Sequence, residues 1–235
     1  MIAGLLALIA ATGGVVYLHR QIAQTEQLEA KRRARKLAAV RAAGPLALSA
    51  IGEYAKECAA ALKQLRRQCG DGPGLHGGQT DLPAVPALPT EVITVFSEFI
   101  EYSEGNDADL IEELMRDIQV MQSRMRGLIS DLANPEVSLS KGFIVDNMIH
   151  AGSIYAQGAA AFEFFRRMSE KLPAAVTWND VKSALRNMEV DENRYPDTFA
   201  EIDRLSERSP GPARWVERKS IQQGSPSAAP QCAPT

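Results

Sequence analysis

The stretch KGFIVDNMIHAGSIYAQGAAAFEFFRRMSEKL, residues 141–172, predicts a long helix at the packing centre of the protein. Apolar side chains recur in it three and four residues apart, which is the spacing of one helix face. Small residues in its middle would let a partner backbone come close, and phenylalanines near its end would fill space. Either Ser138 or Ser140 is expected to cap its start. The predicted inward positions are Ile144, Met148, Ala151, Tyr155, Gly158, Phe162 and Phe165.

Helices are also predicted on both sides of this stretch. An apolar stripe from Leu48 to Cys69 has the spacing of a helix that packs against other helices. A last helix is expected to begin at Tyr195-Pro196. No stretch alternates with the period of two that is typical of strands, so the predicted class is all-α, an antiparallel helical bundle. The expected caps are Thr90, Asn106 or Asp107, and Thr177, and the expected helix ends are Gly105 and Asn134-Pro135.

Two stretches are predicted to interrupt the helices. Gly44-Pro45 should break a long basic helix that continues from the N-terminal segment through residues 21–43. Residues 70–89 are rich in Gly and Pro and are expected to form a flexible linker. The predicted division is an anchor at 1–19, a basic juxtamembrane helix and first bundle helix at 20–69, the linker at 70–89, the helical bundle at 90–208 and a disordered tail at 209–235.

The N-terminal segment, Met1–Leu18, is strongly apolar and carries no charged side chain. A helix of this length covers about 27 Å, close to the hydrocarbon thickness of a bilayer. No base precedes the segment, which favours an uncleaved anchor over a signal peptide. Bases follow it, which predicts a single-pass protein of the plasma (inner) membrane whose C-terminal portion is cytoplasmic. The predicted anchor residues are Leu5, Leu6, Leu8, Ile9, Val15, Val16, Tyr17 and Leu18.

Two features beside the anchor suggest contacts. Ala3, Ala7 and Ala11 recur every fourth residue, and such small faces let membrane helices pair, which makes a homodimer a possible state. A group of bases then follows the anchor. These bases are expected either to meet anionic lipid headgroups or to act only as a topology signal on a solvated face. They are Arg20, Lys31, Arg32, Arg33, Arg35 and Lys36.

The leading functional hypothesis is tethering, in which the anchor holds a protein-binding surface at the membrane. Acidic residues after the linker have few bases near them in the sequence and form the candidate partner surface, with a solvated face as the alternative. A second hypothesis is a membrane-bound sensor or signalling subunit that works by dimer packing. The candidate surface is Glu98, Glu101, Glu104, Asp107, Asp109, Glu112 and Glu113.

Little in the sequence suggests catalysis. The chain has 3 histidines, too few for the usual zinc sites, and no cofactor motif, so neither a metal nor a cofactor is expected. Asp146 and His150, four residues apart, are the best catalytic candidates, but a structural pair is the simpler interpretation. The net charge of -3 argues against nucleic acid as a partner. The 3 cysteines fit free thiols better than a disulfide scaffold.

Overall fold

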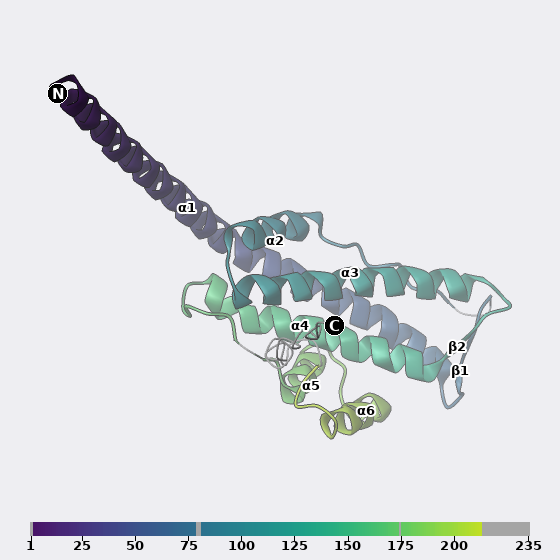
Figure 1. The fold of residues 1–235 in the computed structure, drawn as a ribbon. Helices are drawn as coiled ribbons and strands as arrows, with labels where there is room; N and C mark the ends of the chain where they lie inside the picture. Colours follow the sequence, from purple (N-terminus) through teal and green to yellow (C-terminus); the bar gives the residue numbers. More distant parts are fainter. Residues whose placement is uncertain (1, 79–80, 174, 213–235) are drawn as a thin grey trace, which may run out of the picture.

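The computed structural model describes residues 2–78, 81–173 and 175–212, with side chains described from Tyr17 onward. Helices dominate this part of the chain, as predicted, and form a bundle (Figure 1). The predicted tail falls mostly on residues 213–235, which lie outside the described residues. The elements are α1 (Ile2–Cys69), β1 (Gly74–His76), α2 (Thr90–Tyr102), α3 (Asn106–Ala133), β2 (Ser138–Ser140), α4 (Lys141–Phe165), α5 (Trp178–Asn187) and α6 (Pro196–Ser206).

Helix α4 lies at the centre of the bundle. It runs antiparallel to α1, because Gly44 packs against Phe165 at one end of the pair while Gly52 packs against Tyr155 nearer the other. Helices α2 and α3 lie on the α1 side of the bundle, and α5 and α6 pack on the opposite side of α4 (Figure 1). The predicted packing centre is therefore confirmed.

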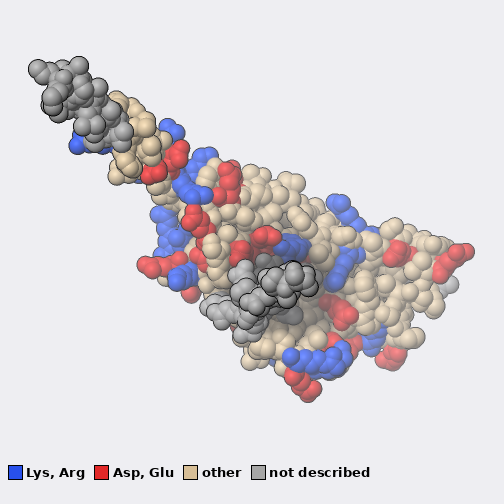
Figure 2. Space-filling view, in the orientation of Figure 1, with Lys and Arg blue, Asp and Glu red and all other residues tan. Residues whose placement is uncertain are grey.

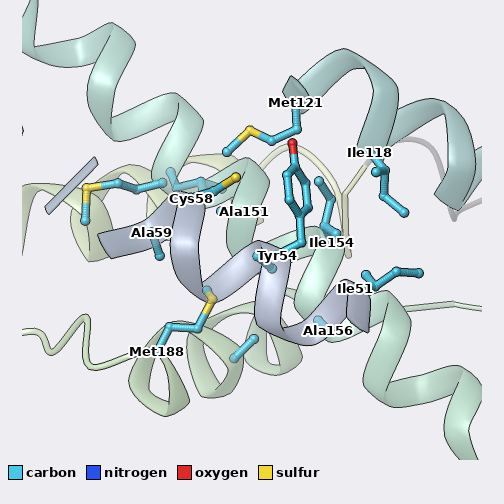
Figure 3. Packing of buried hydrophobic residues seen from close by; sticks show 14 of the residues in the cluster. Ile51, Tyr54, Cys58, Ala59, Ile118, Met121, Ala151, Ile154, Ala156 and Met188 are labelled. Atoms are coloured by element: carbon cyan, nitrogen blue, oxygen red, sulfur yellow. The ribbon is translucent and has the colours of Figure 1, made fainter. Parts of the chain in front are cut away.

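Burial extends around most of α4 rather than along one stripe. Of the predicted inward positions, Tyr155 and Phe162 are only half-buried. A different side of the helix is covered by α5, where a Cβ added at Gly152 would lie 2.9 Å from Leu185 Cγ and 3.2 Å from Val181 Cγ1. A helix covered on two sides needs apolar side chains all round, which a single-stripe interpretation does not anticipate. Figure 3 shows part of this interior, with Ala151, Ile154 and Ala156 of α4. Side chains from other parts of the chain, Tyr54, Cys58, Met121 and Met188, lie in the same cluster.

The end of α4 differs from the prediction. The helix was expected to reach about Leu172, but it ends at Phe165. Arg167 has a φ of 61°, a left-handed conformation that terminates a helix. Arg41 of α1 then holds the segment that follows, since its Nη2 donates to the backbone oxygens of Phe164 (2.6 Å) and Ser169 (3.1 Å).

The predicted break at Gly44-Pro45 is wrong, because α1 continues through Pro45 as one helix of 68 residues. A proline inside a helix removes one hydrogen bond and crowds the residue before it. Here that residue is Gly44, which has no Cβ to clash with the proline ring. The buried side chains that follow, Leu48 and Ile51 among them, stabilise the helix through tertiary packing.

The linker is not wholly irregular, which also corrects the expectation of no strands. Strand β1 pairs antiparallel with β2, with Leu75 opposite Leu139. Glycine is needed for this close approach, since a Cβ at Gly74 would lie 2.0 Å from the Leu139 oxygen. Sequence periodicity cannot reveal a ladder only three residues long whose partners are far apart in the chain.

The predicted helix caps have mixed outcomes. Ser140 caps α4 by accepting from the Phe143 amide at 3.2 Å, and Thr177 forms the predicted capping box with Asp180. Asn134 ends α3 as expected. The other predicted caps are wrong. Pro89 is the N-cap of α2, so Thr90 is already helical, and Gly105 (φ 72°) precedes α3 in place of Asn106 or Asp107.

Candidate interaction site

The predicted anchor lies almost entirely outside the residues whose side chains are described. Residues 2–16 belong to the backbone of α1, but Leu5, Leu6, Leu8, Ile9, Val15 and Val16 carry no described side chain. The two that are described, Tyr17 and Leu18, are exposed by 65% and 58%. Among the described residues, no helix is both long enough and apolar enough to cross a membrane.

The N-terminal part of α1 protrudes from the bundle as a single helix (Figure 1). From Tyr17 to Lys36 every described side chain is exposed, and burial begins at Leu37 and Val40. Residues 2–36 extend about 50 Å by helical rise. This protruding part, called the stalk below, carries the predicted lipid-binding bases, several of which Figure 2 shows in blue along it.

Two of the predicted lipid-binding bases contact the C-terminal end of α2 and the turn that follows it, where the stalk enters the bundle. Arg33 Nη1 lies 2.5 Å from Glu104 Oε1. Lys36 Nζ donates to Tyr102 Oη at 3.3 Å and lies 5.1 Å from the centre of that ring. The hydrogen bond with Tyr102 is the main cause that raises the pKa of Lys36. Lys36 therefore joins α1 to the last residue of α2, and Arg33 joins it to the turn between α2 and α3.

An open groove lies at the same corner, between the stalk and the C-terminal end of α2. Its volume is about 900 Å³, and side chains of both charge signs line it, including Glu26, Glu29, Arg33 and Glu104. A second hollow of about 410 Å³ follows between α1 and α2, and its lining includes Ala39, Val40, Ala43 and Val95. Both are shallow surface features between two helices.

The predicted acidic surface is partly neutralised within the chain. Glu104 pairs with Arg33, and Glu98 and Glu101 are near enough to Lys36 to raise its pKa further. Three of the four predicted acids of α3 also have partners. Asp107 Oδ1 accepts from the Leu172 amide at 3.1 Å, Glu112 pairs with Arg116 at 2.7 Å, and Glu113 is half-buried and has an interaction partner. Asp109 is exposed.

The sequence interpretation missed this neutralisation because it counted bases only near the acids in the chain. Residues 33 and 104 are brought together by the antiparallel pairing of α1 with α2. Knowing that α1 and α2 pair antiparallel would have been enough to find this contact, because the pairing brings Arg33 of α1 to the same end of the bundle as Glu104.

The remaining four predicted lipid-binding bases have no acidic partner among the described residues. Arg20, Lys31, Arg32 and Arg35 are all exposed. No described ion pair or hydrogen bond involves any of them, although Arg32 and Arg35 border the two hollows. The six bases thus form two groups, one engaged with α2 and one open to solvent.

Asp146 and His150 do not form the predicted pair. His150 faces α3, where its Nδ1 lies 3.4 Å from Arg124 Nη1 and its Nε2 lies 3.9 Å from the buried Asp117. Asp146 instead borders a hollow of about 380 Å³ beside α6. Burial and the nearby Glu201 raise its pKa. No described hydrogen bond or ion pair joins the two residues, so this constellation offers no oriented base.

A charged cluster that sequence reasoning missed lies in the same region. Asp197, at the start of α6, accepts from Arg66 Nε and Nη2 at 3.0 and 2.7 Å and lies 3.2 Å from Lys141 Nζ. Partial burial acts to raise the pKa of Asp197, but these two bases lower it overall. The cluster joins α1, α4 and α6 and is structural. Among the described residues, no group of three or more His, Cys, Asp or Glu could hold a metal ion.

The cysteines offer no reactive thiol in the described part of the chain. Cys58 and Cys69 are free and buried, as predicted, and Cys232 lies outside the described residues. Burial raises the pKa of Cys58 to about 12 and also raises that of Cys69. Both are therefore protonated at neutral pH and pack as small apolar groups.

The surface features are thus a stalk with open bases, a groove of mixed charge at its base and a partly neutralised acidic patch. Comparisons of the chain with models of known families, with curated proteins and with solved structures found no match.

Proposed function

We propose that this protein is a membrane-tethered interaction module. In this proposal Met1–Leu18 spans the plasma (inner) membrane once, and the bundle presents a protein-binding surface on the cytoplasmic side. The observation that carries it is the continuity of α1. The same helix that begins in the apolar segment contributes, from Val40 onward, a row of buried side chains to the bundle core beside α4.

Such continuity gives a tether of defined length and direction. A flexible tether would let the bundle sample many positions, whereas a helix fixes its distance from the anchor. From Leu18 to Val40 that distance is about 33 Å by helical rise. The module would therefore bind partners at a set height above the bilayer.

A sensor or signalling subunit is a second candidate, and the same observation favours it. Because Pro45 does not interrupt α1, a displacement of the anchor along its axis would reach the core contacts of Leu48 and Ile51 directly. This candidate requires a dimer in the membrane, for which the Ala3, Ala7 and Ala11 face is the predicted contact. This candidate would be supported if the chain forms crosslinked dimers and if large side chains in place of these alanines abolish the crosslinks. A strictly monomeric protein would reject it.

Membrane fractionation with matched substitutions tests the anchor. Leu8→Arg places a charge inside the apolar segment, at a cost of about 2.5–3.5 kcal/mol for a spanning helix. Leu46→Arg makes the same change at a bundle position that is 76% exposed. We expect the full chain and Leu46→Arg to resist extraction by alkaline carbonate, and Leu8→Arg to be released.

Extraction of the unmodified chain by carbonate would reject the anchor. A reporter fused after Thr235 tests the orientation, since activity on the periplasmic side would reject the cytoplasmic placement.

A further inference from the structure

The acids of the stalk and the four bases without an acidic partner are centred on different faces of α1, although Arg32 and Arg35 also border the two hollows. The acids Glu26 and Glu29 line the groove on the bundle side. At about 100° per residue, the four bases without an acidic partner fall within an arc of about 120° that points away from the bundle core. These bases are Arg20, Lys31, Arg32 and Arg35.

Three large exposed apolar side chains lie on the same arc. Tyr17, Leu28 and Leu46 are exposed by 65%, 59% and 76%. Their separations, 11 and 18 residues, are close to whole numbers of helical turns, so the three side chains align along the helix. Over residues 17–46, all of which are described, helix geometry places no acidic side chain on this arc. We call these three residues and the four bases the outer face.

We propose that the outer face is a docking surface for an acidic helical segment of a partner protein. Positive charge along one face favours a negatively charged partner and raises its rate of encounter. Leucines and a tyrosine repeated at whole turns favour a helix, because a helix presents its own apolar side chains at matching intervals along one face. The proposal names a basic surface of α1, in place of the partly neutralised acidic patch on α2 and α3, as the partner site of the tethered module.

An upright stalk keeps most of the outer face away from lipid headgroups. This step rests on the anchor of the proposed function. Lys31 and Arg35 follow Leu18 by about 20 and 26 Å of helical rise. The headgroup layer is only about 5–8 Å thick, and salt screens charges beyond about 8 Å. Even at a tilt of about 40° Lys31 stays about 15 Å from the hydrocarbon, which leaves only Arg20 within the headgroup layer.

A second copy of the chain is a poor occupant of the outer face. Two stalks anchored in one membrane run parallel, so equivalent residues meet across the pair. Lys31, Arg32 and Arg35 would then face the same bases of the other copy, and like charges repel. The outer face therefore favours a different protein that carries acidic residues.

The test uses the full chain in neutral phosphatidylcholine nanodiscs and a defined probe. The probe is a synthetic fluorescent peptide helix with leucine on one face and glutamate on the others, and its binding is measured by anisotropy. Lys31→Gln with Arg35→Gln should weaken binding about tenfold, from two exposed charge pairs. The control pair, Arg194→Gln with Arg208→Gln, removes the same charge from exposed sites near α6 and should change binding less than about twofold.

The apolar part of the outer face is tested with Leu28→Ser, which should also weaken binding severalfold while leaving the net charge unchanged. Equal weakening by the two charge pairs, or no binding by the unmodified chain, overturns the proposal. A fluorophore attached at Leu28→Cys tests the membrane as the occupant of the outer face. Quenching of this fluorophore by doxyl lipids in phosphatidylglycerol nanodiscs would show that the outer face lies on the membrane, and it would also overturn the proposal. If carbonate extracts the chain from the membrane but the chain still binds the peptide, the docking surface is supported and only the anchor is rejected.

Discussion

The contact between Gly44 and Phe165 should make a normally stabilising substitution destabilising. Replacing glycine by alanine inside a helix ordinarily gains about 0.5–1 kcal/mol. In Gly44→Ala the new Cβ would lie 1.9 Å from Phe165 Cδ1, whereas carbon atoms in contact sit about 3.5–4.0 Å apart. The ring or the whole α1–α4 pair must therefore move by about 2 Å, and such overpacking costs about 1–3 kcal/mol. The expected net loss is about 1–2 kcal/mol.

Gly127→Ala is the matched control, because Gly127 lies within α3 and a Cβ there would meet nothing within 4 Å. It should raise the free energy of unfolding by about 0.5–1 kcal/mol. Urea unfolding of the full chain in mild detergent, followed by circular dichroism, measures both variants. If Gly44→Ala stabilises the protein as Gly127→Ala does, the close α1–α4 packing is wrong.

A double-mutant cycle separates two causes of the expected loss. A Cβ at position 44 would also crowd the ring of Pro45, which disfavours helix at the preceding residue. Phe165→Leu shortens the obstructing side chain but leaves Pro45 in place. In that background the cost of Gly44→Ala should fall by about 1 kcal/mol. An unchanged cost would attribute the effect to Pro45 and contradict the assignment to Phe165.

Three further predictions concern polar contacts, each measured by unfolding of the full chain. Arg41→Ala should cost about 2–3 kcal/mol of unfolding free energy, because it removes hydrogen bonds to two backbone oxygens and the stacking of the guanidinium 4.0 Å from the Phe164 ring centre. Arg33→Ala removes only an exposed ion pair and should cost at most about 0.5 kcal/mol. Equal costs for the two variants would contradict this ranking. The pKa of Asp197 in the folded chain is held below 3.8, so the ionised carboxylate contributes fully to stability above that pH, and this contribution is lost as the pH falls through the lower folded pKa. Asp197→Asn should therefore lose less stability on acidification than the unmodified chain. Parallel curves of stability against pH for the two proteins would reject this prediction. Thr177→Ala should cost about 1 kcal/mol through loss of the capping box, and an unchanged midpoint would show that the cap contributes nothing.

Local signals in the sequence were sufficient for most of the helices. The apolar period of residues 141–172 predicted the central helix, which the structure ends earlier, at Phe165. The Thr177–Asp180 pattern predicted a cap that the structure contains. Both depend on residues within a few turns of each other. Gly44-Pro45 failed as a break because a local rule was overridden by packing of the residues that follow against α4.

The features that the sequence could not supply all depend on contacts between distant residues. The β1–β2 ladder joins residues 75 and 139, and the pairing of Arg33 with Glu104 requires α2 to lie against α1. The division of the bases into two groups has the same origin, since each group is defined by which side of α1 the bundle covers. Helical periodicity could have assigned the faces, but only the fold shows which face is free.

The unbroken stalk also fixes a rotational phase between the apolar segment and the bundle. Each residue added to or removed from residues 19–30 would turn everything beyond it by about 100° and shift it by about 1.5 Å. Removing seven residues would shorten the stalk by about 10 Å yet return the bundle to within about 20° of its original azimuth. The height of the bundle can therefore be changed with little change in its facing direction only in steps of about seven residues, because every other change in length alters both.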